Sequence, residues 1–358
     1  MNDKTTLDPA ATSFDRAHHQ FAPPPPIDKT SDGNSSLTTS LIKGELHVHL
    51  NGLINPRIIQ EVLIDERVEL PEGFDPSRDL VHRSACDTLA SYLTPWQVLR
   101  RIPAKKENLQ KMVDSAFERL AANNVRFVEL RSSILYLAML QNCSVIEACE
   151  RLIECTEISA KRYSVKRALI MTVTRGDYSS VQLNTLISAY KALGEPQDIV
   201  GVDLAGDEEI SCPADLPELF KEAKQQYGLG VTIHAGETGR PENIRIAVER
   251  FDADRIGHGT AAGKNPWLMD LLSKRDICVE VCPISNRLTG AVSASDAHPL
   301  QQFREHGVPF VICSDNPAIH EKGLDDDYAA ALTEGVSLQE IRAQYEVAQR
   351  YSFIKDFV

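Results

Sequence analysis

Four residues of types that commonly bind metal ions each follow a short apolar run in the sequence. His47 and His49 end the first such run, His234 ends the fifth and Asp315 follows the eighth. Side chains two residues apart on a strand point to the same side, so His47 and His49 can share one ion. Three imidazoles and one carboxylate suit Zn²⁺, with water in the remaining coordination position. We therefore expect one zinc ion per chain, bound by His47, His49, His234 and Asp315.

Two residues beside these ligands have side chains suited to acid–base chemistry. Glu237 lies just after His234 in the chain, and His258 ends the sixth apolar run. A zinc ion lowers the pKa of a bound water molecule from about 15.7 toward about 7, which makes hydroxide available at neutral pH. Glu237 could then protonate a ring nitrogen of a substrate, and His258 could orient or deprotonate the water. Together with Asp315 they form the predicted catalytic set for a hydrolysis.

A parallel barrel would bring these positions together. Eight short apolar or β-branched segments alternate with longer amphipathic segments, which is the pattern of βα units. Eight such units predict an α/β fold, the (β/α)8 TIM barrel, in which catalytic residues lie at the C-terminal ends of the strands. No G-x-G-x-x-G motif follows the first predicted strand, which disfavours an open dinucleotide-binding sheet. The predicted strands are 44–49, 126–131, 168–174, 199–205, 230–234, 254–257, 277–282 and 309–314, and the predicted helices between them include 109–122, 145–163, 179–193, 214–227, 241–250 and 266–273.

Two segments depart from this alternation. Residues 1–42 are rich in Pro, Ser, Thr, Asp and Asn and include four consecutive prolines, so we expect a disordered N-terminal tail. Residues 43–358 then form the barrel domain. Residues 52–108 interrupt the first βα unit with helix-like pieces, so we expect a helical insertion on the catalytic face. It could be a lid that excludes water or a flap that only stabilises the barrel.

Several sequence blocks resemble the signature motifs of the adenosine deaminase family. They are HVHLNG, HAGE, RIGHGT, SN followed by TGAV, and SDNP, and they occur in the family's order between about residues 43 and 345. The resemblance implies a zinc-dependent hydrolase of C–N bonds in cyclic amidines. Such an enzyme removes the 6-amino group of adenosine or a related adenine nucleoside or nucleotide and releases ammonia. It also implies that Glu237 is the proton donor, that His258 assists the hydroxide and that the backbone of Gly206 meets the purine.

Two positions differ from the family's commonest pattern. Asn316 stands where a second aspartate usually follows the zinc-ligand aspartate, and Asn51 stands where adenosine deaminases have an aspartate near the ribose 5′ end. An amide can still donate to a bare ring nitrogen, so we expect His49, Asn51, Gly206 and Asn316 to bind substrate. Asn51 resembles a branch that deaminates N6-methyl-AMP, whereas the block 285–292 resembles the nucleoside deaminases. We favour a nucleoside over a nucleotide and hypothesise that a modified adenosine is processed.

Five other polar residues lie near strand ends or late loops. Arg131 and Arg175 end the second and third strands, and either could reach a polar substrate group or neutralise a buried carboxylate such as Asp203. Asp203 itself could form hydrogen bonds around the site. We expect His298 and His320 to be structural or surface residues.

The bulk composition limits the partners and the compartment. The chain of 358 residues is 42% hydrophobic and 25% charged, as in globular proteins. A net charge of −13 argues against a nucleic-acid or anionic-membrane partner, because such surfaces need basic patches. A small-molecule purine nucleoside or nucleotide remains the expected partner. Eight scattered cysteines, no signal peptide and no long apolar run predict a cytoplasmic protein with reduced thiols, and the oligomeric state is not indicated.

Other function classes remain open. Two-metal amidohydrolases and phosphotriesterases on this scaffold usually use a bridging lysine from the fourth strand, and 199–205 contains none. A catalytically weak relative that only binds a nucleoside is the non-enzymatic alternative, and Asn316 is the residue that favours it. The other class of zinc deaminase is disfavoured, because its H-x-E and P-C-x-x-C motifs are missing.

Overall fold

The protein is described by a computed structural model that covers residues 37–86, 89–102 and 105–357. Most of the predicted tail, residues 1–36, lies outside the described residues. Residues 37–42, the last part of the predicted tail, are described. They contact the barrel, since Thr38 is buried and its carbonyl oxygen accepts a hydrogen bond of 2.9 Å from Nζ of Lys43.

The predicted barrel is confirmed. In the described part of the chain eight strands form one sheet in sequential order, and all neighbouring pairs are parallel. The ring closes where Val48 pairs with Asp315 and where N–H of His49 donates to the carbonyl oxygen of Asp315 at 3.0 Å. The strands are β1 (Lys43–His49), β2 (Val125–Ser132), β3 (Lys166–Thr174), β4 (Ile199–Ala205), β5 (Gly230–Ala235), β6 (Arg255–His258), β7 (Cys278–Val281) and β8 (Phe310–Ile312).

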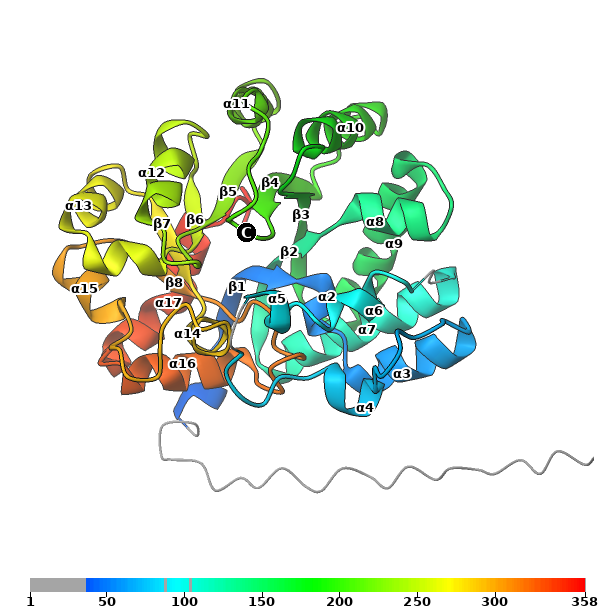
Figure 1. The fold of residues 1–358 in the computed structure, drawn as a ribbon, viewed down its shortest axis with the longest axis horizontal. Helices are drawn as coiled ribbons and strands as arrows, with labels where there is room; N and C mark the ends of the chain where they lie inside the picture. The colour runs from blue at the N-terminus through cyan, green and yellow to red at the C-terminus, as the bar shows by residue number, and fades with distance from the viewer. Residues whose placement is uncertain (1–36, 87–88, 103–104, 358) are drawn as a thin grey trace, which may run out of the picture. The chain divides into compact units, whose positions relative to one another are not determined.

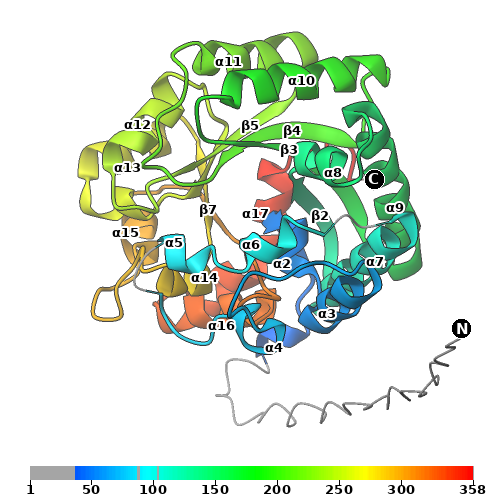
Figure 2. The same cartoon turned by 45° about the vertical axis from the view of Figure 1, so that its right-hand side comes forward.

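Helices surround these strands, as Figures 1 and 2 show. Local sequence defines their ends: Ser144 and Glu147 form a capping box at the start of α9, and a proline opens α12 and α13. None of the described helices is long and apolar enough to cross a bilayer. The helices that follow the strands are α7 (Lys106–Ala122), α8 (Ile134–Leu140), α9 (Val145–Tyr163), α10 (Ser179–Ala192), α11 (Leu216–Tyr227), α12 (Pro241–Glu249), η1 (Thr260–Lys264), α13 (Pro266–Lys274), α14 (Pro283–Leu288), α15 (Leu300–Glu305), α16 (Leu324–Thr333) and α17 (Leu338–Tyr351).

The insertion after β1 consists of short helices. They are α2 (Leu50–Leu53), α3 (Pro56–Asp65), α4 (Pro76–Asp79), α5 (Leu89–Tyr92) and α6 (Trp96–Leu99). Hydrogen bonds hold this segment to the C-terminal side of the barrel: N–H of His82 donates to the carbonyl oxygen of Ile319, and N–H of Cys86 donates to that of Leu288, both at 2.8 Å. The insertion therefore contacts the loops that follow β7 and β8.

The barrel interior is unusually polar for a buried core. Glu129, Arg131, Asp203, Arg255 and Glu280 are each at most 1% exposed and project from β2, β4, β6 and β7. Buried charges persist in proteins only when they are paired and hydrogen-bonded. Their partners connect them to the residues at the C-terminal ends of the strands.

Candidate metal centre and active site

The four predicted metal ligands lie together at the C-terminal end of the barrel. Nε2 of His49 is 3.3 Å from Nε2 of His234 and 3.5 Å from Oδ1 of Asp315. Nε2 of His47 is 3.7 Å from the same Asp315 oxygen. Potential ligand atoms of His47, His49 and His234 all lie within 4.8 Å of one another, and so do those of His47, His258 and Asp315. The geometry therefore brings together residues from β1, β5, β6 and the segment after β8.

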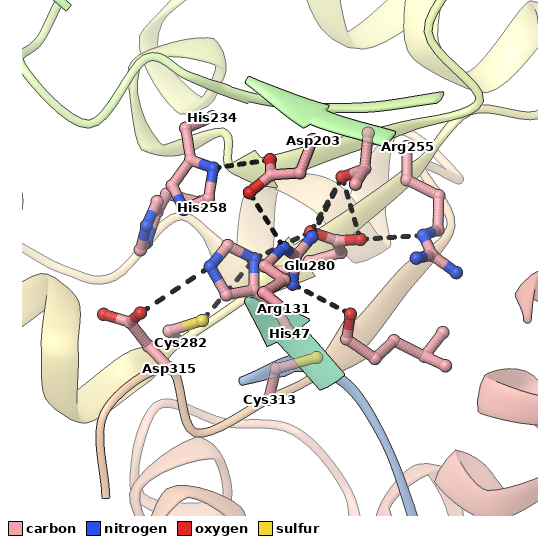
Figure 3. A network of polar contacts seen from close by, with 12 residues as sticks. His47, Arg131, Asp203, His234, Arg255, His258, Glu280, Cys282, Cys313 and Asp315 are labelled. Atoms are coloured by element: carbon pink, nitrogen blue, oxygen red, sulfur yellow. Dashed lines mark hydrogen bonds and ion pairs between the residues drawn. The ribbon is translucent and has the colours of Figure 1, made fainter. Parts of the chain in front are cut away.

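The far nitrogens of two of these imidazoles are bound by carboxylates. Nδ1 of His47 is 2.7 Å from Oε2 of Glu280, and Nδ1 of His234 is 2.9 Å from Oδ1 of Asp203 (Figure 3). A carboxylate at Nδ1 places the proton there and leaves the lone pair of Nε2 for a metal ion. Nε2 of His47 is buried and has no hydrogen-bond partner, so its lone pair is free to bind a metal ion.

The buried charges around the ligands also fit a divalent cation. Arg131 pairs with Glu280 at 2.6 Å and with Asp203 at 3.3 Å, and Arg255 pairs with Glu280 at 2.7 Å and with Glu129 at 2.6 Å. With the ligand carboxylate, four buried carboxylates face two guanidinium groups. These carboxylates outnumber the guanidinium groups, so the charges of this cluster favour a bound cation.

Burial favours the neutral form of the imidazoles, which is the form that binds a metal ion. It lowers the pKa of His47 well below its ordinary value and that of His49 to about 4, so both rings are neutral at pH 7. Burial also acts to lower the pKa of His234, but the charge and hydrogen bond of Asp203 outweigh it and leave that pKa raised. Binding of a metal ion must therefore compete with a proton mainly at His234.

His258 and Asp315 have an unusual backbone conformation. Their φ angles are 63° and 58°, in the left-handed region that residues other than glycine rarely adopt. Such positions cost about 1–3 kcal/mol each and cluster at functional sites. Here they turn both side chains inward at the last residue of β6 and shortly after the end of β8.

Glu208 holds the loop that carries Glu237 beside the candidate ligands. The carboxylate of Glu208 accepts hydrogen bonds from N–H of Gly236 and of Glu237, both at 2.7 Å, and from Nδ2 of Asn243 at 2.8 Å. Burial, with the charge of Asp315, raises the pKa of Glu237 to about 8. The Glu237 carboxyl group is thus protonated at pH 7 and can act as an acid.

His258 faces Glu237. Its Nε2 is 3.6 Å from Oε2 of Glu237, and its Nδ1 is 3.0 Å from Nδ2 of Asn286. Ser285, next to Asn286, donates a hydrogen bond of 2.6 Å to Oδ2 of Asp315. The SN block of the sequence therefore supports two of the three predicted catalytic residues.

A cavity of about 160 Å³ opens onto these groups. All four predicted substrate-binding residues, His49, Asn51, Gly206 and Asn316, line it. Gly206 has a φ of 101°, which a side chain would disfavour, so its backbone can lie bare on the cavity wall. The apolar part of the lining comes largely from the insertion, α7 and α8, with Leu93, Trp96, Leu99, Met112 and Leu137 among its residues.

The sequence predicts that the insertion lies on the catalytic face, but it does not predict the contacts of Tyr92. The hydroxyl of Tyr92, from α5, is 2.7 Å from Nε2 of His320 and 3.5 Å from Oδ2 of Asp315, and it accepts a hydrogen bond of 3.1 Å from Nδ2 of Asn316. No motif marks a tyrosine in a helical insertion as part of a metal centre. The contact depends on how the insertion folds back over the barrel.

Other supporting residues left a weak signal in the sequence. Glu280 is a lone charged residue within the apolar segment 277–282. Of the two uses left open for Arg131, the structure selects the neutralisation of buried carboxylates, including Asp203. Arg175 instead donates to the carbonyl oxygen of His234 at 2.7 Å. His298 and His320 are 1% and 4% exposed, so neither is a surface residue.

Comparisons with known proteins agree with this geometry. The profile of the adenosine deaminase family matches residues 43–356. An adenosine deaminase of Shigella flexneri is 30% identical over 311 residues, which cover 86% of this chain and 92% of the relative. An adenosine deaminase of Clostridium botulinum is 30% identical over 283 residues, which cover 78% and 84% of the two chains.

Solved structures share the fold at lower identity. An adenine deaminase from Arthrobacter aurescens superimposes with a TM-score of 0.78 at 24% identity and covers 88% of this chain and 95% of that one. An N6-mAMP deaminase of Arabidopsis gives a TM-score of 0.75 at 21% identity, with coverage of 90% and 96%. A Burkholderia ambifaria amidohydrolase with bound Zn gives 0.80 at 17%, with coverage of 92% and 91%.

Proposed function

Because the chain belongs to the adenosine deaminase family of C–N hydrolases, we propose that it removes the 6-amino group of an adenine nucleoside in a zinc-dependent hydrolysis. The observation that carries the proposal is the unpartnered Nε2 of buried His47, which faces the other ligand atoms beside a protonated Glu237. His47, His49, His234 and Asp315 would hold the ion. Zinc there would supply a Lewis acid that makes water nucleophilic at neutral pH.

The residues around the ion have distinct roles in this proposal. Glu237 donates its proton to the purine ring nitrogen beside C6, which makes C6 electrophilic. His258 and the carboxylate of Asp315 orient the attacking water. As the water oxygen forms its bond to C6, one of its protons passes to the carboxylate of Asp315 and then to the amino group. The C6–N6 bond breaks, ammonia leaves, and the proton of the new C6 hydroxyl group returns to the carboxylate of Glu237. The product is an inosine-type nucleoside.

The charges of the cavity favour a nucleoside over a nucleotide. Among its described lining residues the cations are Arg100 and Arg131. Arg131 is committed to Glu280 and Asp203, and the Arg100 guanidinium lies 5.1 Å from the ring centroid of Tyr136. Phosphate groups are usually held by several charge-assisted hydrogen bonds, and the described cavity wall offers no such cluster.

A purine panel tests the proposal. Zinc-loaded protein is incubated with adenosine, 2′-deoxyadenosine, AMP, N6-methyl-AMP and adenine, and release of ammonia or methylamine is measured. We expect the nucleosides to be the best substrates, and Glu237→Gln to retain zinc while it loses most turnover. Preference for AMP or N6-methyl-AMP would overturn the nucleoside assignment. Tight purine binding without amine release would identify a binding protein instead.

A further inference from the structure

A buried chain of three side chains runs from His258 away from the cavity. Nδ1 of His258 is 3.0 Å from Nδ2 of Asn286, and Oδ1 of Asn286 is 3.2 Å from Nε2 of His298. The three residues are 2%, 0% and 1% exposed. His298 lies between α14 and α15, and the proposed reaction gives it no role.

Each of these two hydrogen bonds can have its donor on either side. An amide has one end that donates and one that accepts, and a neutral imidazole carries its proton on one nitrogen only. In the first arrangement His298 donates from Nε2 to Oδ1 of Asn286, whose Nδ2 donates to Nδ1 of His258. In the second arrangement the amide is reversed, so Nδ1 of His258 and Nδ1 of His298 must both carry protons.

The environment of His298 distinguishes the two arrangements. Burial lowers the pKa of His298 to about 4, so its ring is neutral at pH 7. Nδ1 of His298 is buried without a hydrogen-bond partner. A proton there would leave a buried donor unsatisfied, at a cost of about 1–3 kcal/mol. A bare acceptor nitrogen is tolerated more readily, so the first arrangement is favoured.

We propose that His298, acting through Asn286, is a positioning residue that fixes His258 in the tautomer with its proton on Nε2. That nitrogen faces Glu237 at 3.6 Å. His258 then enters the reaction as a hydrogen-bond donor that orients the attacking water, not as a base that removes its proton. Of the two roles that the sequence left open for His258, this selects the first. Its meaning for catalysis rests on the proposed function, but the tautomer itself does not.

Nuclear magnetic resonance tests the tautomer directly. Full-length, zinc-loaded protein with ¹⁵N-labelled histidine is examined at pH 7.5, and long-range ¹H–¹⁵N correlations show which nitrogen of each ring carries the proton. The His258 signals are assigned from a His258→Asn variant. We expect a protonated Nε2 and a bare Nδ1 for His258 in the unmodified protein.

Variants of His298 test the hydrogen-bonded series His298–Asn286–His258, called the relay below. His298→Leu removes the donor, so we expect the Asn286 amide to reverse in part, Nδ1-protonated His258 to appear, and kcat to fall by about 10-fold or more with little change in KM. His298→Gln presents an amide N–H near the position of Nε2 and should restore both readouts. His306→Leu is the matched control. Nδ1 of His306 is 3.0 Å from the carbonyl oxygen of Gln302 in its own helical segment, and His306 is not one of the three residues of the relay.

The outcomes separate this proposal from the proposed function. A proton on Nδ1 of His258 in the unmodified protein overturns the relay, even if adenosine is deaminated. An unchanged tautomer in folded His298→Leu overturns it as well. The expected tautomer in a protein that releases no ammonia from any purine supports the relay and overturns the function.

Discussion

The carboxylate of Asp203 offers a direct test of how the barrel interior would prepare the proposed metal centre. It accepts from Nδ1 of His234 at 2.9 Å, and its other oxygen lies 3.3 Å from Nε of Arg131. The neighbouring charges of His234 and Arg131 outweigh burial and lower the pKa of Asp203 to about 2, so it is ionised at pH 7. It therefore holds the proton of His234 on Nδ1 and leaves Nε2 for the metal ion.

Asp203→Asn should move the proton of His234 from Nδ1 to Nε2, the nitrogen that would bind the metal ion. An amide in this place cannot accept from both neighbours, because its NH₂ end must face either Arg131 or His234. Facing a guanidinium is the worse choice, so the NH₂ end turns to Nδ1 of His234 and drives the proton to the ligating Nε2. Loss of such a partner typically costs about 10- to 100-fold in metal affinity, or about 1.4–2.7 kcal/mol.

Competition with a chromophoric zinc chelator at pH 7 measures this loss. Asp198→Asn is the matched control, because Asp198 precedes the same strand, has a side chain that is 41% exposed, and pairs with Arg167 and not with a candidate metal ligand. Stability without metal is measured separately by chemical denaturation, since Arg131 loses one of its two carboxylate partners. If Asp203→Asn binds zinc as tightly as the unmodified protein, the assignment of Asp203 as the orienting partner of His234 is wrong.

Four further predictions follow from individual contacts. The pKa of Glu237 is raised to about 8, so kcat/KM should be retained below that pH and fall as the pH rises through it, and the same alkaline limb in Glu237→Gln would contradict this. Removal of zinc by a chelator should lower the melting temperature. If free zinc starts at 100 times Kd, the unfolding free energy should fall by about 2.7 kcal/mol. The ring of Phe353 lies 3.7 Å from the Arg255 guanidinium carbon, so Phe353→Ala should cost about 2 kcal/mol in denaturant titrations, and a cost near zero would rule out that contact. Tyr92→Phe leaves Nδ2 of Asn316 without its acceptor and should lower the unfolding free energy by about 1–3 kcal/mol; a melting temperature identical to that of the unmodified protein would contradict the contact.

The sequence by itself determined the strands and the candidate ligands. A buried parallel strand is a short apolar run. The sequence therefore predicts β4 residue for residue as Ile199–Ala205, and it predicts both ends of every other strand to within two residues. Because parallel strands place their C-terminal ends on one face of a barrel, a polar residue after each run was enough to predict that His47, His49, His234 and Asp315 converge.

Only the tertiary structure decided which residues support that centre. Glu280 contacts His47 across 233 residues of chain, Tyr92 contacts Asp315 across 223, and neither pairing leaves a periodic pattern in the sequence. The same holds for His298, which the sequence predicts to be a structural or surface residue and which Asn286 connects to His258 in the structure. Hydrogen bonds between distant side chains depend on angles and positions set by the whole barrel, whereas strand formation and strand-end placement depend on the local order of apolar and polar residues.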